Sequence, residues 1–220
     1  MVVLIAAPIA AQATAARSPV SPVFFGTAHP KVAAGGPGKL QVIGSAPAWN
    51  RMTLYVMVKN NTKTTYSGLK LTASGAVSGS GDRQGFNPVS VAPGQVALGY
   101  VHFATRIPAG ATPSLALSAR KGVDKRLRDL GLGEAKVVIN PGGSSALRGT
   151  LVNPSRSPAR RPLIVDVFCF KPDGSLSGTG GQGAASGSGS LGQLATAAFA
   201  VQLGRGGCPT FLVAASGRAS

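Results

Sequence analysis

The stretch Leu54–Ala73, LYVMVKNNTKTTYSGLKLTA, decides the fold class of this chain. From Leu54 to Val58, Leu and Val occupy every second position, which is the period-2 pattern of a strand with one buried face. The polar segment Asn60–Thr62 then interrupts the run with turn-forming residues. The alternation resumes from Leu69 to Ala73. The stretch therefore predicts a strand, a turn and a second strand.

A related unit returns later in the chain, at offsets of 93 to 98 residues. Five short matches keep their order: Lys39–Val42 with Lys136–Ile139, Val58–Thr62 with Leu151–Ser155, Leu69 and Leu71 with Leu163 and Val165, Gly94–Ala97 with Gly192–Ala195, and Leu115, Leu117 and Ala119 with Phe211, Val213 and Ala215. A unit of about 95 residues is too long for a solenoid repeat but has the size of an immunoglobulin-like sandwich. The recurrence indicates duplication, and chance similarity of short turn motifs is the alternative.

The predicted fold is all-β, with two tandem immunoglobulin-like β-sandwich domains at residues 39–121 and 136–217. Short apolar runs separated by Gly, Pro, Asn and Asp support this assignment. Residues 122–135 form a short connector, in which Leu127 and Leu130 share one helical face and predict a short helix.

One expected strand of the second domain, Leu163–Phe170, is apolar on both faces. Leu163, Val165, Val167 and Cys169 line one face, and Ile164, Asp166, Phe168 and Phe170 line the other. The following Lys171–Gly174 segment predicts a hairpin turn.

The N-terminal segment Met1–Ala16 is apolar and ends in small residues before Arg17, like a signal peptide with an A-x-A-type cleavage site. The usual basic n-region is missing. A short buried strand or helix is the alternative. Residues 17–38, rich in Pro and Gly, predict an irregular arm. No segment reaches the length of an ordinary transmembrane helix.

Both units resemble the FxLYD-type immunoglobulin-like domains of bacterial envelope proteins. The resemblance rests on Gly149–Ser155, Leu163–Phe170 with Asp173-Gly174, Leu191–Gln193 and Phe199 in the second unit, and on Val58–Thr62, Pro93–Gln95 and Phe103 in the first. It implies a small extracytoplasmic β-sandwich and no catalytic residues.

The charge balance is strongly basic, with 22 Lys and Arg against 6 Asp and Glu and a formal net charge of +16. Such a field attracts polyanions. Two basic clusters are candidate anion-binding residues: Arg120, Lys121, Lys125, Arg126 and Arg128 at the connector, and Arg156, Arg160 and Arg161 in the second unit. A merely solvated surface is the alternative interpretation.

The two cysteines, Cys169 and Cys208, are a candidate disulfide in an exported protein. The alternative is a buried Cys169 with Cys208 free. The two histidines, His29 and His102, stand apart from the scattered acids, so no metal site is expected. Gly178–Gly183 matches G-x-G-x-x-G, but no helix follows, and we interpret it as a flexible loop.

These observations predict a non-enzymatic, exported protein without cofactors, located outside the cytoplasm. Its expected role is adhesion, scaffolding or binding of anionic polymers at the envelope, with such a polymer or another envelope protein as partner. Binding of nucleic acid or anionic lipid is an alternative. Nucleic acid is the weaker choice because aromatics are only 5% of the residues. An uncharacterised hydrolase is the second alternative, but the small number of acidic residues and histidines argues against it.

Overall fold

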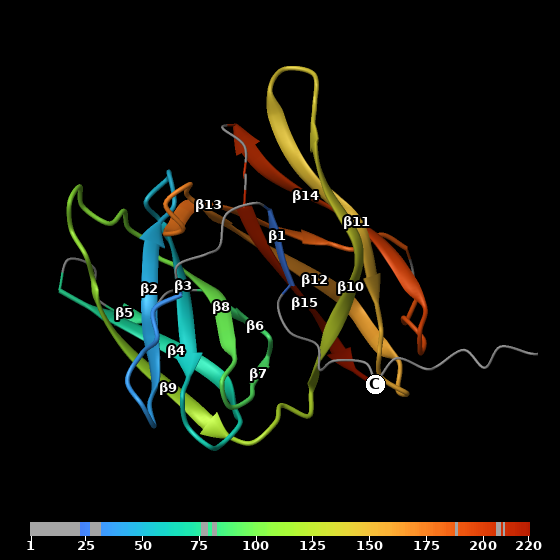
Figure 1. Cartoon of the computed structure of the whole chain (residues 1–220), viewed down its shortest axis with the longest axis horizontal. Coiled ribbons are helices and arrows are strands. Elements are labelled where there is room, and N and C mark those ends of the chain that lie inside the picture. The colour runs from blue at the N-terminus through green and yellow to red at the C-terminus, as the bar shows by residue number, and fades with distance from the viewer. Residues whose placement is uncertain are drawn as a thin grey trace, which may run out of the picture.

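The computed structural model describes residues 23–26, 32–75, 79–80, 83–187, 189–205, 208 and 210–220, with the backbone alone at 23–26, 79–80, 83 and 204–205. These residues are all-β, without an α-helix (Figure 1). The strands are β1 (Val23–Gly26), β2 (Leu40–Pro47), β3 (Thr53–Asn60), β4 (Tyr66–Ser74), β5 (Gly79–Ser80), β6 (Arg83–Asn87), β7 (Ser90–Val91), β8 (Val96–His102), β9 (Ser114–Lys121), β10 (Leu127–Ile139), β11 (Ser144–Val152), β12 (Ala159–Phe170), β13 (Leu176–Ala184), β14 (Thr196–Arg205) and β15 (Thr210–Ala219).

The strands form antiparallel sheets that fall into two halves, β2–β9 and β10–β15 (Figure 1). The first half has one sheet in the order β2-β3-β8-β6 and another in which β4 pairs with β5, β7 and β9. The second half follows the order β13-β12-β15-β10-β11-β14. Its long strand β10 pairs with β15 through Leu127–Leu130 and then with β11 from Gly131, so it passes from one layer of the sandwich to the other.

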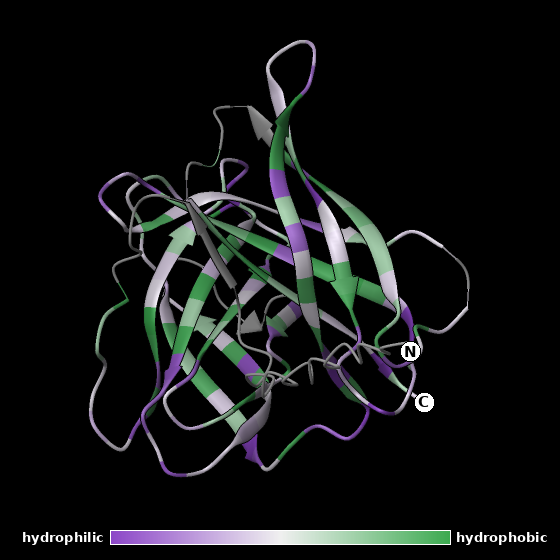
Figure 2. Ribbon diagram, turned by 45° about the vertical axis from the view of Figure 1, so that its right-hand side comes forward, coloured by the Kyte–Doolittle hydropathy of each residue, from purple (hydrophilic) through white to green (hydrophobic). Residues whose placement is uncertain are grey.

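Apolar clusters fill the interior of each half and the space between the halves. Leu54, Val56 and Leu71 belong to the core of the first half, and Leu163 and Val201 to that of the second. Figure 2 shows the apolar residues recurring along the strands of both halves. A further cluster joins the halves, and its buried members are Ala46, Met57, Leu98, Phe168, Phe170, Leu176 and Leu212. The halves therefore share a core, which we call the inter-half interface.

Strand β12 lies between two of these cores, which explains its apolar character on both faces. Leu163, Val165 and Val167 are fully buried inside the second half. Phe168 and Phe170 are buried on the opposite face, against the first half. The two faces assigned to Leu163–Phe170 from the sequence are thus both interior faces.

A buried asparagine organises the turn after β3. Asn60 has no exposed surface, and its Nδ2 donates to the carbonyls of Thr64 and Val91, both at 2.8 Å. Its Oδ1 accepts from the backbone N–H of Thr62 at 3.0 Å. The side chain therefore satisfies backbone groups that the turn leaves unpaired.

The turn after β11 uses the same set of contacts. Asn153 is also fully buried, and its Nδ2 donates to the carbonyls of Ser157 at 2.9 Å and Leu191 at 2.8 Å. Its Oδ1 accepts from the N–H of Ser155 at 3.0 Å. The local likeness that the sequence indicated between these two segments is thus present in their hydrogen bonds.

The same geometry corrects one detail of the sequence alignment. Gly94 donates its N–H to the carbonyl of Asn60, and Leu194 donates its N–H to the carbonyl of Asn153. Both residues have a positive φ, 78° and 59° respectively. Gly94 therefore corresponds to Leu194, two residues beyond the Gly192 that sequence similarity matched to it.

The predicted helix in the connector is wrong. Leu127–Ile139 forms β10, so the second half begins at Leu127 rather than at residue 136. Leu130 is buried, and Leu127, 38% exposed, pairs with Arg218. The spacing of two leucines is compatible with either structure over such a short segment, and pairing with β15 decides in favour of the strand.

Two further expectations are corrected. The N-terminal arm includes a strand, because Val23–Gly26 pairs with Thr210–Val213 of β15. The glycine-rich segment is strand β13 rather than a flexible loop. A Cβ on Gly178 would clash with the carbonyl of Pro47, and one on Gly181 with that of Gln202. Glycine here permits close approach of neighbouring strands. The predicted signal peptide, residues 1–16, lies outside the described residues.

Candidate functional site

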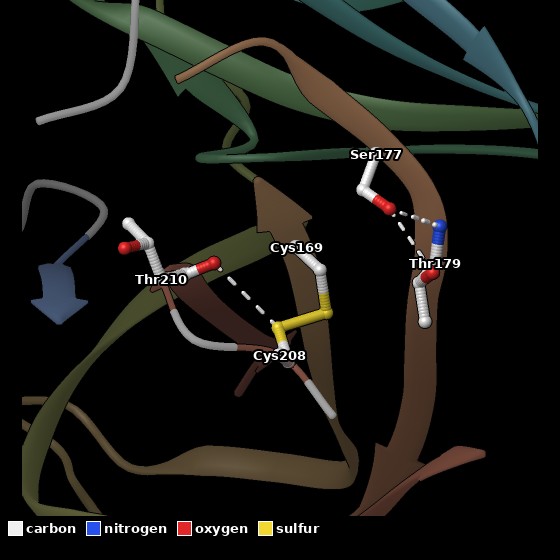
Figure 3. Close-up of a disulfide and its surroundings, with 5 residues drawn as sticks. All are labelled: Cys169, Ser177, Thr179, Cys208 and Thr210. Carbon is white, nitrogen blue, oxygen red and sulfur yellow. Dashed lines mark hydrogen bonds between the residues drawn. A yellow bond between two sulfur atoms is a disulfide. The ribbon is translucent and has the colours of Figure 1, made fainter. Parts of the chain in front are cut away.

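The two cysteines are bonded to each other (Figure 3). The Sγ atoms of Cys169 in β12 and Cys208 before β15 are 2.03 Å apart, and the Cα atoms are 5.4 Å apart. Both residues are buried in the core of the second half. The bond ties the C-terminal strand to its neighbour and leaves no free thiol in the described residues.

The structure brings most of the predicted basic residues to the junction between β9 of the first half and the start of β10 in the second half. Arg120 and Arg126 both reach the carboxylate of Asp124, at 3.5 and 3.9 Å. The Nη1 of Arg128 donates to the Oγ of Ser155 at 3.1 Å, which places Arg128 beside the loop that carries the exposed Arg156. The exposed Lys121 and Lys125 are sequence neighbours of these residues.

A residue that the sequence analysis missed completes this surface. Arg160 of β12 lies directly opposite Arg218 of β15, and Arg218 is also the register partner of Leu127. Like charges directly opposite each other across two strands destabilise a sheet. Arg218 stands near the C-terminus without basic neighbours in sequence, so only the strand register reveals it. We call Arg120, Lys121, Lys125, Arg126, Arg128, Arg156, Arg160 and Arg218 the basic cluster.

Arg161 does not belong to the basic cluster, although it was predicted with it. Its guanidinium donates to the backbone carbonyls of Ala185 and Ser186 in the loop after β13. Successive side chains of a strand point to opposite faces, which separates Arg161 from Arg160. Arg161 therefore holds a loop in place.

A second group of polar residues lies at the inter-half interface. Asp166 of β12 is 3% exposed and has no cation partner among the described residues. Gln182 donates to its Oδ1 at 2.8 Å, and Asn87 donates to its Oδ2. The same Nε2 of Gln182 donates to the hydroxyl oxygen of Tyr100 at 3.0 Å. Residues of both halves thus form one hydrogen-bond network.

Burial controls the ionisation of this network. Desolvation raises the pKa of Asp166 to about 6, although hydrogen bonds from Gln182 and Asn87 act in the opposite direction. Desolvation also raises the pKa of Tyr55, and the negative charge of Asp166 raises it further. Asp129 similarly has its pKa raised to about 6 by burial, against hydrogen bonds from the backbone of Val89 and Ser90.

Three cavities lie along the interface near this network. The first, of about 300 Å³, is lined by Asn87, Tyr100, Asp166 and Gln182 among others. The second, of about 180 Å³, shares Tyr100, Asp166 and Gln182 with the first and adds Tyr55. The third, of about 540 Å³, shares Tyr55 with the second and is also lined by Trp49, Asn50, Thr53, Thr179 and Gln202. We call these adjoining cavities the interface groove.

Within the described residues no three His, Cys, Asp or Glu side chains gather as metal ligands, and no helix there could span a membrane. His102 contacts Thr53 Oγ1 through its Nδ1 at 3.2 Å, and His29 lies outside the described residues. No family model, curated protein or solved structure matches the chain. The candidate sites are therefore the basic cluster and the interface groove.

Most of the basic cluster is recognisable in the sequence, whereas none of the groove is. Tyr55, Tyr100 and Gln182 lie far apart in sequence on strands of different halves. Trp49 was the only tryptophan and could have been singled out. That Trp49 and Tyr55 line a cavity with Gly178, Thr179 and Gly180 follows only from the packing of β13 against the β2–β3 hairpin.

Proposed function

We propose that this protein is a non-enzymatic, exported binding protein that attaches to an anionic polymer of the cell envelope through its basic cluster. One observation carries the proposal: Arg160 and Arg218 lie opposite each other on neighbouring strands. In the described residues the ion pairs are those of Asp124 with Arg120 and Arg126, so neither Arg160 nor Arg218 has a carboxylate partner. A bound anion would relieve their repulsion.

Arg128 supports the same assignment. It is half-buried, its Nη1 donates to Ser155 Oγ, and it has no carboxylate partner among the described residues. Arginine offers the planar fork that suits phosphate or carboxylate groups. Phosphate or carboxylate groups along a polymer are therefore the expected ligands, and adhesion or scaffolding is the expected use.

The proposal includes export of the chain and its origin by duplication of one domain. The disulfide supports export to an oxidising compartment. The matched turns at Asn60 and Asn153 support a tandem duplication of an immunoglobulin-like unit. With the resemblance to FxLYD-type domains, they favour an envelope protein with two such domains.

The test compares two triple variants that each remove three positive charges. In the first, Arg126, Arg160 and Arg218 of the basic cluster are replaced by Gln. In the control, the exposed Arg106, Arg148 and Lys171, which are not part of the cluster, are replaced by Gln. Retention on heparin and on immobilised teichoic acid is measured from low to high salt.

We expect the cluster variant to elute at clearly lower salt than the control. The slope of log affinity against log salt should become shallower by about two to three, because each lost contact releases one counterion fewer. Equal elution of the two variants would mean that only net charge matters, and the proposal would then be wrong.

A further inference from the structure

The interface groove has a composition that the anion-binding proposal does not explain. Three aromatic side chains, Trp49, Tyr55 and Tyr100, line it in succession through cavities that share residues. Tyr55 and Tyr100 are direct partners across β3 and β8. Tyr55 is also fixed by an edge contact with Phe168, with ring centroids 5.6 Å apart. Tyr55 and Tyr100 therefore stand on a paired sheet, whereas Trp49 lies on the β2–β3 turn.

Trp49 is held outward by its turn. It is 91% exposed, although tryptophan is rarely left in water. The turn is closed by hydrogen bonds from Arg51 N–H to the carbonyl of Ala48 and from Met52 N–H to Asn50 Oδ1. Arg51 adopts a φ of 58°, which is unfavourable for a residue with a Cβ. Strain of this kind is typical of ligand-binding sites.

The polar groups of the groove include both donors and acceptors. Gln182 uses both hydrogens of its Nε2, on Asp166 and Tyr100, and no partner for its Oε1 is found among the described residues. Because Tyr100 accepts from Gln182, its own hydroxyl hydrogen remains available. Asn87 is 3% exposed, and its Oδ1 has no partner in the described part of the chain. A ligand rich in hydroxyl groups, which both donate and accept, suits this set.

The charge of the groove limits the ligand further. Asp166 is the one carboxylate that lines both the first and the second cavity, and it forms no ion pair among the described residues. An anionic group bound there would be repelled whenever Asp166 is ionised.

We propose that the interface groove binds a linear, uncharged glycan. The apolar faces of its sugar rings stack on Trp49 and Tyr55, and its hydroxyl groups bond with Tyr100, Gln182 and Asn87. Three cavities that share lining residues suit a chain of sugar units rather than a single one. This activity is separate from anion binding, because none of the stacking residues belongs to the basic cluster.

Trp49 provides a direct assay because it is the only tryptophan of the chain. The full chain is titrated with cellohexaose and chitohexaose while tryptophan emission is recorded. Stacking would move the ring out of water, so the emission maximum should shift to shorter wavelength. Calorimetry then measures the affinity for Trp49→Ala, which we expect to be at least about tenfold weaker, as for loss of one aromatic platform. Ile139→Ala, at the exposed end of β10, is the matched control.

The basic-cluster triple variant separates the two proposals. It should lose retention on polyanions yet bind the oligosaccharide like the wild type. Trp49→Ala should do the reverse. The glycan proposal is wrong if neither hexasaccharide shifts the emission or gives heat at a Kd below about 1 mM. It is also wrong if Trp49→Ala binds as tightly as Ile139→Ala.

Discussion

Replacement of Asn153 by Ala should be among the most destabilising single changes outside the apolar cores. The change removes three hydrogen bonds, to the carbonyls of Ser157 and Leu191 and from the N–H of Ser155. Each is worth about 1 kcal/mol net, so we expect a loss of roughly 3 kcal/mol in the free energy of unfolding. For a chain of this size that corresponds to a fall in Tm of about 6–12 °C.

The measurement is urea unfolding followed by far-ultraviolet circular dichroism, because the exposed Trp49 is a poor reporter of folding. Asn60→Ala should lose a similar amount, since Asn60 bonds to Thr64, Val91 and Thr62 in the same way. Asn61→Ala is the control. Asn61 is only half-buried and bonds to the arm at Ala34 and Gly36, so its loss should cost about 1 kcal/mol or less. If Asn153→Ala costs no more than Asn61→Ala, the structural importance assigned to the buried asparagines is refuted.

Three further predictions follow from local geometry. Burial raises the folded-state pKa of Asp166 to about 6, above its unfolded value. The free energy of unfolding should therefore fall by about 3 kcal/mol as the pH rises from about 4 to above 6. Asp166→Asn should remove that part of the pH dependence, which denaturation at pH 4 and pH 7.5 measures. Replacing Cys169 and Cys208 together by Ala should lower the unfolding free energy by roughly 3–4 kcal/mol, because their bond closes a long loop; an unchanged denaturation midpoint would contradict this. Leu194→Gly should stabilise the protein by up to about 1 kcal/mol, and Gly94→Ala should destabilise it, because both positions have a positive φ. Thermal melts in which both changes shift Tm in the same direction would refute the correspondence of Gly94 with Leu194.

Local patterns in the sequence were sufficient for the fold class. Period-2 alternation from Leu54 to Val58 predicted β3, and the two-faced apolar run at Leu163–Phe170 predicted β12. Both turns with buried asparagines were recognised from short polar segments. These features depend on residues close in sequence, whose spacing records which face is buried.

Features decided by distant contacts could not be predicted in this way. Leu127–Leu130 has no strong local preference, and it becomes a strand because the end of β15 offers an edge for pairing. The glycine-rich sequence of β13 is typical of a flexible loop, because the neighbouring sequence does not show that Pro47 and Gln202 pack closely against it. Arg218 faces Arg160 and Leu127, and Trp49 lines a cavity with Gly178 of β13, and all of these partners are distant in sequence.

The inter-half interface links the two proposed activities to the fold. Its apolar members, such as Phe170 and Leu98, bury the face of β12 that a free sandwich would leave in water. The same contact places Asp166 against Asn87 and Tyr100, and so creates the groove. One end of the groove is lined by Asp124 and Leu127, which adjoin the basic cluster. If both proposals hold, a polymer that carries sugar units and separate anionic groups engages both surfaces at once, and its overall affinity exceeds that of either site alone.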